Sequence, residues 1–592
     1  MRDRRNTNLS TSSASSSSST ASVPSRTSLS EKRHPGTPPS SPELPSPVTR
    51  SHRPRVGSRR LMAVRTLAVV CCVLLFWRCF TSWPLLASGG GVSSTLGQEL
   101  VGTVGLPDEP TALLVTDSSG HQKWTVAIPQ NASFPLRDGK YNDVCKQGED
   151  LSRRLNSESR LSRVKDWRRR GSYYAPDRSF LDIADAEQSG ALPASQRAPS
   201  EDVCLTSLTF ALNTDDVSFG KSLLMLWLSY GLAKKENRAF FVDDSQWPYG
   251  KYTSYFAPPP PQGCSPPLPH HILPCPHQAK HLLVSAATAS WTFGSSFEEH
   301  FTHQRVHGAR KYQQIYSLVR AGYEGLFKLV GNDAEYAQSR IAGMKEDAAS
   351  HGGSVVGMQI RRGDQHPHEY QYRSDYLPLE RYAAGARSLF RKLLGGREPS
   401  HALHGDPADF STVVEYVHSP LLLASDDPDV IARPELSQAA APFTVQKAQE
   451  RILLATKATL DATSPVAPIR EPGSAYVKHI DENSGWEGGF YSGLFHSLGI
   501  AKTTSDSGTL ERLGDLTGAA RGEVPRQAMR MRELVARAYL LDLAVLGESD
   551  GVVCAVSSAA CRILGVMLGW DAVVHDRWVN VDDGRPWSWD GQ

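Results

Sequence analysis

The sequence predicts an α/β fold organised around a Rossmann-like parallel sheet, and three observations lead to this prediction. Short apolar segments that suit buried strands include residues 355–360 and 551–556. Segments with helical apolar spacing, such as residues 379–394, alternate with these strands, as is typical of parallel sheets. Polar residues follow the two strands directly, beginning at Arg361 and Ser557, and ligands of such sheets bind beyond the carboxyl ends of the strands.

The length and charge of the chain narrow the possible classes of protein. The chain has 592 residues, enough for two or three domains, and a formal net charge of only +2. We therefore expect no nucleic-acid partner, because such partners require a marked excess of basic residues. Residues 10–60 are dominated by Ser, Thr, Pro and Arg, a composition that buries too little apolar surface to fold. We predict that residues 1–60 are a disordered tail.

Residues 61–87 are the most apolar stretch of the chain, and we predict that they form a single transmembrane signal anchor. Arg78 lies near one end, where its side chain can reach the membrane interface. The alternative is a cleavable signal peptide, which we disfavour because about sixty residues precede the apolar core. Arginines gather on the amino-terminal side, so the positive-inside rule places the tail in the cytosol and the rest in the lumen. This is the topology of a type II membrane protein.

Six cysteines follow the predicted anchor, and an even number in an oxidising lumen permits disulfides. These cysteines are Cys145, Cys204, Cys264, Cys275, Cys554 and Cys561. The sequence contains no CxxC pair, so we expect no structural zinc site. Cys554 and Cys561 bracket the turn after the strand at residues 551–556. A bridge there would fix the loop, and two buried thiols are the alternative.

The chain beyond the anchor begins with two regions of different composition. We interpret residues 88–200 as a stem, with short apolar runs at residues 111–128 that suit a few strands. Residues 201–350 are the amino-terminal α/β part of the folded region. They contain a helix pattern at residues 223–232 and a buried strand at residues 238–243.

Two further helix patterns complete this part, at residues 312–329 and 333–349. The sequence Gly220-Lys221-Ser222 suggests a P-loop, but the first glycine of that motif is missing because position 215 is Asp. We therefore reject a P-loop here.

Residues 351–592 form the second α/β part, and its central strand at residues 355–360 ends in two arginines. Arg361 and Arg362 present guanidinium groups, whose rigid array of donors suits phosphate. Asp364 and Glu369 add carboxylates within a few residues. The alternative is a solvated charge cluster at a surface strand end.

Three more elements of this part carry polar residues of interest. A short strand at residues 421–424 ends before Asp426 and Asp427. A helix is expected at residues 449–460, and a long amphipathic helix at residues 530–546 contains Asp542.

The last unit combines a strand at residues 551–556, the pair Ser557 and Ser558, and a helix that ends near residue 568. A helix amino terminus offers backbone N–H groups and a favourable dipole to an anion. The alternative is a simple helix cap without a ligand.

These pieces together resemble the core α1,6-fucosyltransferases that modify N-glycans, and their bacterial relatives that fucosylate chitin oligosaccharides. Four segments carry the resemblance, in the family's order across residues 200–580. They are Ser245-Gln246-Trp247 with Tyr249, residues 357–369 with residues 377–382 downstream, residues 424–428, and residues 553–562. The fourth segment is long and specific, whereas an Arg-Arg-x-Asp sequence alone would be weak.

The resemblance implies a GT-B-like glycosyltransferase that moves fucose from GDP-fucose to a glycan or glycoprotein acceptor, with inversion and without a metal or other cofactor. The acceptor would be an N-glycan core or a related sugar that contains N-acetylglucosamine. The protein would lie in the Golgi membrane with its catalytic part in the lumen, and residues 351–592 would bind GDP-fucose.

The resemblance also assigns roles by position in the motifs. Arg361 and Arg362 would be catalytic, with Arg361 on the GDP phosphates, and Glu369 would be the general base. Asp542 would contact guanine. The other substrate-binding residues would be Tyr249, Gln359, Asp364, Asp426, Asp427, Ser557 and Ser558. A Cys554–Cys561 disulfide is implied, and Cys204–Cys264 is the next pair we expect.

Three residues depart from the family's pattern. Gln359 replaces a His that touches the base, Gln365 replaces a Lys beside the catalytic carboxylate, and Ala559 replaces a Gln. Two alternatives to a core α1,6-fucosyltransferase stay open, and the departures at Gln365 and Ala559 motivate the second of them. One is a protein O-fucosyltransferase, which shares a similar arginine motif but lacks the segment at residues 553–562. The other is a catalytically inactive family member that serves as a scaffold or lectin.

Overall fold

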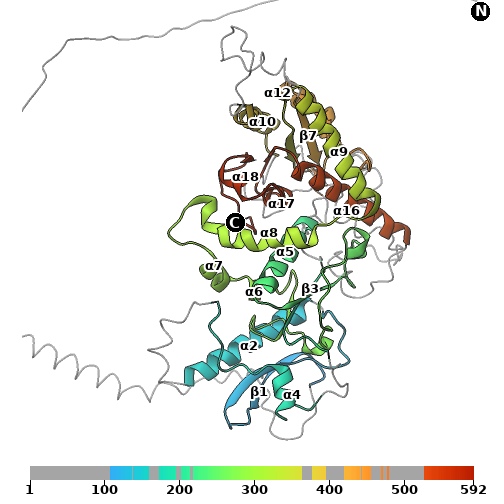
Figure 1. Cartoon of the computed structure of the whole chain (residues 1–592). Helices are drawn as coiled ribbons and strands as arrows, with labels where there is room; N and C mark the ends of the chain where they lie inside the picture. The colour runs from blue at the N-terminus through green and yellow to red at the C-terminus, as the bar shows by residue number, and fades with distance from the viewer. Residues whose placement is uncertain are drawn as a thin grey trace, which may run out of the picture. The chain divides into compact units, whose positions relative to one another are not determined.

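The computed structural model describes residues 107–136, 138–158, 173–194, 202–213, 218–362, 376–394, 419–441, 443–454, 469–470, 477–478 and 526–591 (Figure 1). The chain divides into two units, Met1–Ser93 and Ser94–Gln592, and all described residues belong to the second unit. The predicted tail at residues 1–60 and the predicted anchor at residues 61–87 lie outside the described residues. Among the helices that the structure describes, none has the length and apolar character needed to cross a membrane.

The larger sheet has five strands in the order β12-β11-β6-β7-β8, and every neighbouring pair is parallel. The strands are β6 (Val356–Ile360), β7 (Pro420–Ser425), β8 (Thr444–Lys447), β11 (Gly551–Cys554) and β12 (Trp578–Asn580). The predicted α/β class and the three strands expected in this part are confirmed. Gly357 permits close packing, because a Cβ at this position would lie 2.9 Å from Cγ2 of Val552.

Helices cover both faces of this sheet, so its central strands β6, β7 and β11 are buried on both sides, as parallel strands usually are. Helices α10 (Leu379–Leu394) and α12 (Pro434–Ala440) share a core with Val356, Met358 and Ile360 of β6. The opposite face packs against α9 (Gly331–Ser350), α16 (Arg526–Gly547) and α17 (Ala559–Leu568). Side chains alternate along a strand, so Gln359 faces the side of α16 and α17.

The smaller sheet has three parallel strands in the order β4-β3-β5. They are β3 (Ser207–Ala211), β4 (Ala239–Asp243) and β5 (His281–Val284). Helices α5 (Phe219–Lys235) and α8 (Gln313–Leu326) pack tightly against each other beside it. Glycines allow this approach: a Cβ at Gly231 would lie 2.0 Å from the backbone oxygen of Leu318, and one at Gly322 would lie 2.1 Å from that of Trp227.

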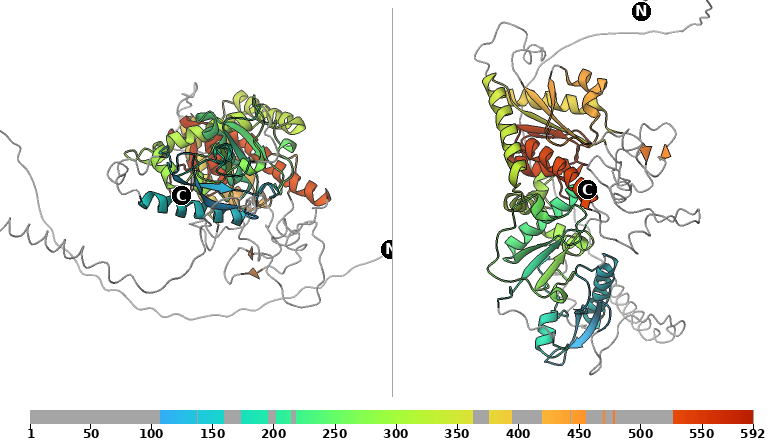
Figure 2. Two further views of the ribbon diagram at one scale, coloured as in Figure 1. Left: turned by 90° about the horizontal axis from the view of Figure 1, so that it is seen from below. Right: turned by 90° about the vertical axis from the view of Figure 1, so that its right-hand side faces the viewer.

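The two sheets belong to parts of the chain that share one apolar core. The Tyr316 hydroxyl of α8 donates to the backbone oxygen of Gly565 in α17, at 2.9 Å. Arg320 Nη1 donates to the backbone oxygens of Val566 and Met567, at 2.6 and 2.8 Å. Figure 2 shows the green elements around the smaller sheet lying next to the red carboxyl-terminal elements.

Residues that we expected to form a stem are folded. Within residues 88–200, the described residues form the antiparallel pair β1 (Thr111–Thr116) and β2 (Gln122–Ala127), with helices α2 (Asp138–Glu158) and α4 (Ile183–Gln188). Their core includes residues of the smaller sheet and the segment before β5, among them Ala211 and Leu283. The expected strands are therefore present, but they belong to a packed layer. The domain boundaries themselves remain predictions.

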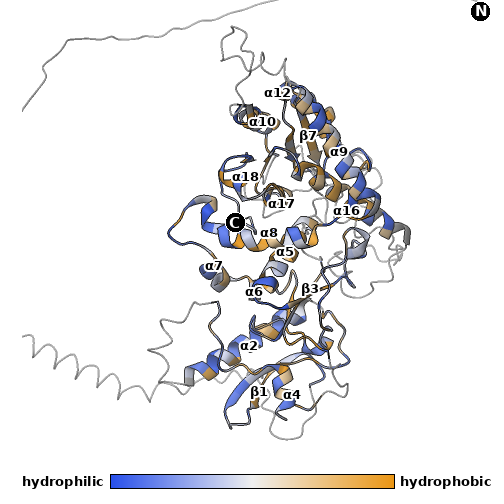
Figure 3. Cartoon of the chain, in the orientation of Figure 1, coloured by the Kyte–Doolittle hydropathy of each residue, from blue (hydrophilic) through white to orange (hydrophobic). Residues whose placement is uncertain are grey.

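The charged surface of this layer explains the stem interpretation. Much of α2 is hydrophilic (Figure 3), whereas most residues of α5 are buried. A Cys145–Cys275 disulfide joins α2 to the segment before β5, a pair that the sequence left unassigned. The two predicted disulfides, Cys204–Cys264 and Cys554–Cys561, are both present.

One expected helix is wrong in the part that the structure describes. Residues 449–454 are irregular, and the remainder of the expected helix at residues 449–460 lies outside the described residues. The Gln449 side chain holds this turn, because its amide donates to the Ile452 backbone oxygen at 2.8 Å and its Oε1 accepts from the Ile452 N–H at 2.9 Å. These bonds replace those of a helix.

The remaining elements are short. They are α6 (Ala289–Thr292), α7 (Ser295–Phe301), α18 (Trp570–Val574), β9 (Ile469–Arg470), β10 (Val477–Lys478), η2 (Tyr252–Ser254), η3 (Pro269–His271), η4 (Gly308–Tyr312) and η5 (Val430–Ala432).

Candidate functional site

A pocket lies at the carboxyl ends of β6 and β7, between these strands and helices α16 and α17. Its lining residues are Gln359, Arg361, Ala424, Ser425, Asp426, Leu454, Tyr539, Asp542, Leu543, Leu546, Ser558 and Ala560. Because β6, β7 and β11 are parallel neighbours, polar residues that follow them in sequence meet at one edge. The pocket thus brings together five predicted residues from four segments of the chain.

Arg361 is fixed at this edge by Asp426. Its Nη1 donates to Asp426 Oδ2 at 3.3 Å, and the Arg362 backbone N–H donates to Asp426 Oδ1 at 2.6 Å. The side chains of Arg361 and Asp426 are only 8% and 4% exposed. The Asp426 carboxylate therefore holds both the Arg361 guanidinium and the backbone of the next residue, Arg362. The positive charge of Arg361 thus has a fixed position at the pocket.

Next to the Arg361–Asp426 pair lie two further arginines, Arg362 and Arg433. Arg433 Nη2 pairs with Asp427 Oδ2 at 3.4 Å. The Arg362 guanidinium lies 5.2 Å from the centre of the Tyr376 ring. Burial, and secondly the nearby Arg433, lower the pKa of Arg362. A site that lowers the pKa of an arginine penalises its charge, and an anion would relieve this penalty.

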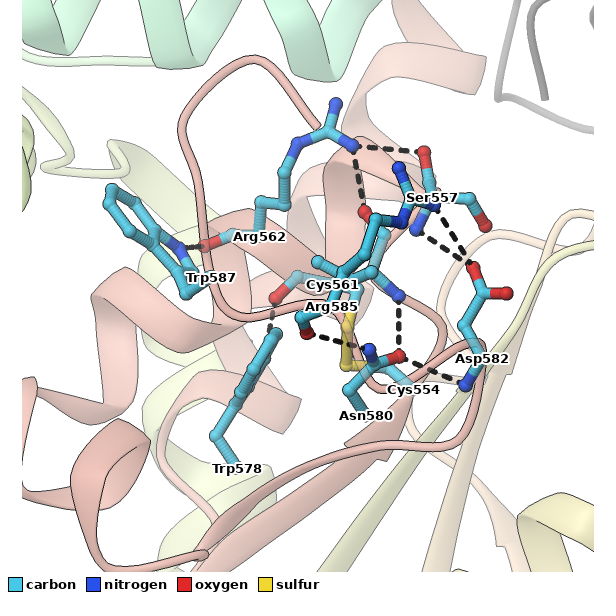
Figure 4. The surroundings of a disulfide bond; sticks show 10 residues. Cys554, Ser557, Cys561, Arg562, Trp578, Asn580, Asp582, Arg585 and Trp587 are labelled. Carbon is cyan, nitrogen blue, oxygen red and sulfur yellow. Dashed lines mark hydrogen bonds and ion pairs between the residues drawn. A yellow bond between two sulfur atoms is a disulfide. The ribbon is translucent and has the colours of Figure 1, made fainter. Parts of the chain in front are cut away.

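The turn before α17 is held rigidly by hydrogen bonds (Figure 4). Arg562 Nη1 donates to the backbone oxygens of Val556 and Ser557, at 2.8 and 2.9 Å. The Asn580 Oδ1 accepts from the Val556 N–H at 3.0 Å. The Cys554–Cys561 disulfide closes the same turn. The turn is therefore organised before any ligand arrives.

The two predicted serines of this turn have different positions. The Ser557 N–H donates to Asp582 Oδ2 at 3.3 Å, so a carboxylate of the protein itself takes this donor (Figure 4). Ser558 is the N-cap of α17 and lines the pocket, whereas Ser557 is not among the pocket's lining residues. The Ser558 hydroxyl makes no capping bond to the helix. Of the two, Ser558 is placed to meet a ligand.

Two buried polar atoms point to a ligand in this pocket. Gln359 is 8% exposed and Ser558 is 1% exposed. Within the part of the chain that the structure describes, neither Gln359 Oε1 nor Ser558 Oγ has a hydrogen-bond partner. A buried polar atom without a partner costs about 1–3 kcal/mol, a cost that a bound polar ligand can remove.

Asp542 of α16 lines this pocket and also a neighbouring pocket. Asp427, Lys447 and Gln449 are among the other residues of the second pocket. Desolvation raises the pKa of Asp542 well above its usual range, while Lys447 and the Gln449 N–H act in the opposite direction. A desolvated carboxyl group that faces two pockets is a strong candidate for ligand recognition.

Other predicted residues lie elsewhere. Tyr249 is 2% exposed and does not line either pocket; its ring contacts Phe219 with a centroid separation of 4.8 Å. Phe219 in turn contacts Tyr539, which does line the pocket, at 5.6 Å. Tyr249 therefore contacts the pocket wall only indirectly, through Phe219. Asp364 and Glu369 lie outside the described residues.

The sequence analysis missed Tyr539, Lys447 and Asp582. Tyr539 stands one helical turn before Asp542, so the helical spacing of α16 was a usable signal. Lys447 ends a strand, β8, that was not predicted, and Asp582 follows β12, which was also missed. Without those strands the sequence could not place either residue at this edge.

No protein-family model matches the chain, and no curated protein matches it. Among solved structures, the fucosyltransferase NodZ from Bradyrhizobium gives a match at 11% identity over 61% of this chain and 92% of that chain, with a TM-score of 0.25. A structure of NodZ alpha-1,6-fucosyltransferase soaked with GDP-fucose gives the same values. One co-crystallized with GDP gives 11% identity over 61% of this chain and 91% of that chain, with a TM-score of 0.23. These values are too low to support a functional argument.

Proposed function

We propose that this protein is an inverting glycosyltransferase that moves fucose from GDP-fucose to a glycan acceptor. The observation that carries the proposal is the single pocket shared by Arg361, Ser558 and Asp542. These residues come from three of the parallel-sheet units and offer a guanidinium, a hydroxyl at a helix amino terminus and a carboxyl group. That set suits a nucleoside diphosphate, and the resemblance of four sequence segments to core α1,6-fucosyltransferases supports fucose as the sugar.

The proposed fold is GT-B-like. The smaller sheet with α5 and α8 forms one half, and the five-stranded sheet with its helices forms the other. In this arrangement the donor binds at the edge of the carboxyl-terminal sheet, where the pocket lies. The acceptor would approach from the side of the other half.

The diphosphate would bind at Arg361 and at the amino terminus of α17. As the bond to the sugar breaks, GDP gains negative charge. Hydrogen-bond donors fixed beside the diphosphate then stabilise the transition state. Asp426 holds Arg361 in place before the reaction, so little reorganisation is needed. The low exposure of the Arg361 side chain strengthens its attraction for the phosphate.

The guanine base would contact Asp542. Guanine presents N–H donors on its Watson–Crick edge, which a carboxylate can accept. Gln359 supplies a further buried acceptor at the same pocket. The second pocket, which shares Asp542 with the first, gives the base and the ribose room beyond the diphosphate.

Glu369 would act as the general base. An acceptor hydroxyl oxygen forms the new bond to fucose C1 while the bond from C1 to the β-phosphate oxygen breaks. Glu369 takes the hydroxyl proton, and GDP leaves with the bonding electron pair. Such proton transfer contributes roughly 10²–10⁴-fold to a rate. Asp364 lies in the same segment and would help to line the substrate site.

We further propose an N-glycan core, or a related sugar containing N-acetylglucosamine, as the acceptor. The compartment would be the Golgi lumen, with residues 61–87 as the membrane anchor. The three disulfides of the described residues are compatible with an oxidising compartment.

Purified full-length protein tests the proposal against its alternatives. GDP-fucose would be supplied with no acceptor, with a glycan that carries N-acetylglucosamine, or with a protein that offers Ser and Thr hydroxyls. Release of GDP that increases with the glycan supports the proposal. Transfer only to the protein hydroxyls indicates a protein O-fucosyltransferase. Binding of GDP without turnover indicates the inactive scaffold, for which Gln365 and Ala559 are the motivation. No binding of GDP would contradict the proposal.

A further inference from the structure

Three side chains far from the pocket form a cluster of metal-binding type: Glu187 of α4 and His270 and His271 of η3. One ligand atom from each lies within 4.8 Å of the other two. His271 Nε2 is 3.0 Å from Glu187 Oε2, and His270 Nε2 is 3.7 Å from Glu187 Oε1. The carboxylate therefore faces both imidazoles, with one oxygen toward each.

All three side chains are withdrawn from solvent. The side chains of His270, His271 and Glu187 are 8%, 11% and 12% exposed. An isolated carboxylate at such a position is costly unless a partner balances its charge. Any cation bound here would be close to the carboxylate in surroundings where water screens little.

Hydrogen bonding within the protein does not complete this cluster. The imidazole of His271 lies at hydrogen-bond distance from Glu187 Oε2, at 3.0 Å. Within the described part of the chain, His270 Nε2 is buried and has no hydrogen-bond partner, although it is aimed at the same carboxylate. A purely structural Glu–His pair would need only one histidine. An ion pair between Glu187 and His271 therefore does not explain the buried His270 Nε2, which has no hydrogen-bond partner among the described residues.

We propose that Glu187, His270 and His271 bind a divalent transition-metal ion, with Zn²⁺ as the best match. Zinc binds imidazole nitrogen and carboxylate oxygen at about 2.0–2.2 Å, so its tetrahedral ligands lie about 3.3 Å apart. His271 Nε2 lies 3.0 Å from Glu187 Oε2 and His270 Nε2 lies 3.7 Å from Oε1, so each imidazole has a carboxylate oxygen near that distance, and Glu187 would bind through one of the two. Oxygen-preferring ions such as Mg²⁺ are disfavoured by two imidazole ligands. A water molecule would fill the fourth position.

The position of the cluster indicates a structural metal. The Asp182 carboxylate at the start of α4 accepts from the N–H of Lys280, the residue before β5, at 2.8 Å. Lys280 Nζ also pairs with Asp185 Oδ1, at 2.5 Å. The cluster thus lies near the amino end of the smaller sheet, and ligands of such sheets bind at the opposite end. The metal would clamp α4 to the segment before β5. This revises the expectation, drawn from the lack of a CxxC pair, that no structural zinc site exists.

The test uses full-length protein without a histidine tag, stripped of metal by a chelator and then dialysed against Zn²⁺ or Mg²⁺. The wild type should retain Zn²⁺ and not Mg²⁺, and Zn²⁺ should raise its unfolding temperature. His270→Gln and His271→Gln should each weaken Zn²⁺ binding by more than about 100-fold, since even loss of a supporting residue costs 10–100-fold. The metal content is measured by mass spectrometry.

A matched control is His281→Asn. This nearby buried histidine bonds Ser207 Oγ through Nδ1 at 3.0 Å, and Asn can keep that bond. The control should bind Zn²⁺ like the wild type. Should a ligand variant fail to fold, Co²⁺ in the wild type gives a second measurement, because tetrahedral imidazole and carboxylate ligation has a distinctive visible absorption spectrum. Two results overturn the proposal: a wild type that retains no Zn²⁺ and gives no such spectrum, or ligand variants that bind Zn²⁺ as tightly as the wild type.

Discussion

Arg361 Nη1 lies 3.3 Å from Asp426 Oδ2, although the two residues are 65 positions apart in the sequence. The contact exists because β6 and β7 are parallel neighbours in register, so the residues that follow them meet at the same edge. Asp426 also accepts the Arg362 N–H. One carboxylate thus positions the cation that we assign to the donor diphosphate.

Asp426→Asn tests this positioning role. The amide keeps the shape of the side chain but loses its charge and one of its two acceptors. Hydrogen bonds to charged groups contribute about 1.5–3 kcal/mol, so turnover should fall by about 10- to 100-fold. The fall should be larger in turnover than in unfolding temperature. Asp333→Asn is the matched control, because Asp333 is also a shielded carboxylate, 2.6 Å from Arg537 Nε. Equal loss of turnover in both variants would show that the effect is general destabilisation.

Asp542→Asn should have opposite effects on stability and binding. Desolvation raises the pKa of Asp542 in the folded protein. The folded state therefore binds this proton more tightly than the unfolded state, and stability is lost as the pH rises above about 4 through the raised pKa. The Asn variant lacks that loss of stability, so it should be more stable than the wild type at neutral pH and equally stable near pH 3.

The affinity of the Asp542→Asn variant for GDP should fall, because the carboxylate that would accept guanine N–H groups is gone. Thermal unfolding against pH, with calorimetric GDP binding, checks both; unchanged affinity would remove Asp542 from the base site.

The disulfides should differ in what they stabilise. Cys145 and Cys275 are 130 residues apart, whereas Cys554 and Cys561 are 7 apart. Loop entropy predicts stabilisation of about 5 kcal/mol for the long loop and about 2.5 kcal/mol for the short one. Replacing the Cys145–Cys275 pair with serines should therefore lower the unfolding temperature more. Replacing the Cys554–Cys561 pair should lower turnover more, since that bridge closes the turn that holds Ser558. The reverse order of effects would contradict this division.

Glu369→Gln tests the proposed general base. The amide keeps the shape, so GDP should bind as before, while transfer should fall by roughly 10²-fold or more. An unchanged rate would remove Glu369 from the mechanism. A loss of GDP affinity would assign it to the donor site instead.

The central strands of the larger sheet could be predicted from the sequence, for an identifiable physical reason. Strands at the centre of a parallel sheet are buried on both faces, so β6, β7 and β11 are nearly continuous apolar runs that are easy to recognise. The polar residues that follow them were therefore assigned correctly to one edge, and Arg361, Asp426 and Ser558 do meet there.

The strands that were missed are less distinctive. Edge strands β8 and β12 are short and only partly buried, so their sequences, Thr444–Lys447 and Trp578–Asn580, lack an apolar run. Residues 88–200 were interpreted as a stem because they begin Gly-rich and then become strongly charged, although apolar residues in their described part pack against residues far along the chain. The hydrogen bond from the Ser557 N–H to Asp582 could not be predicted either, because Asp582 is positioned by β12, which was missed. Long-range packing of this kind leaves little trace in local sequence.

The most direct test of the central claim is GDP-fucose turnover by the wild type and by Arg361→Ala, measured together with GDP affinity. Arg305→Ala, which removes an exposed arginine, is the control. We predict that the wild type releases GDP from GDP-fucose and that Arg305→Ala is unchanged. Arg361→Ala should stay folded but lose transfer and bind GDP more weakly, with a lower unfolding temperature because the buried Asp426 carboxylate loses this ion pair. Near wild-type turnover by a folded Arg361→Ala protein would contradict the account.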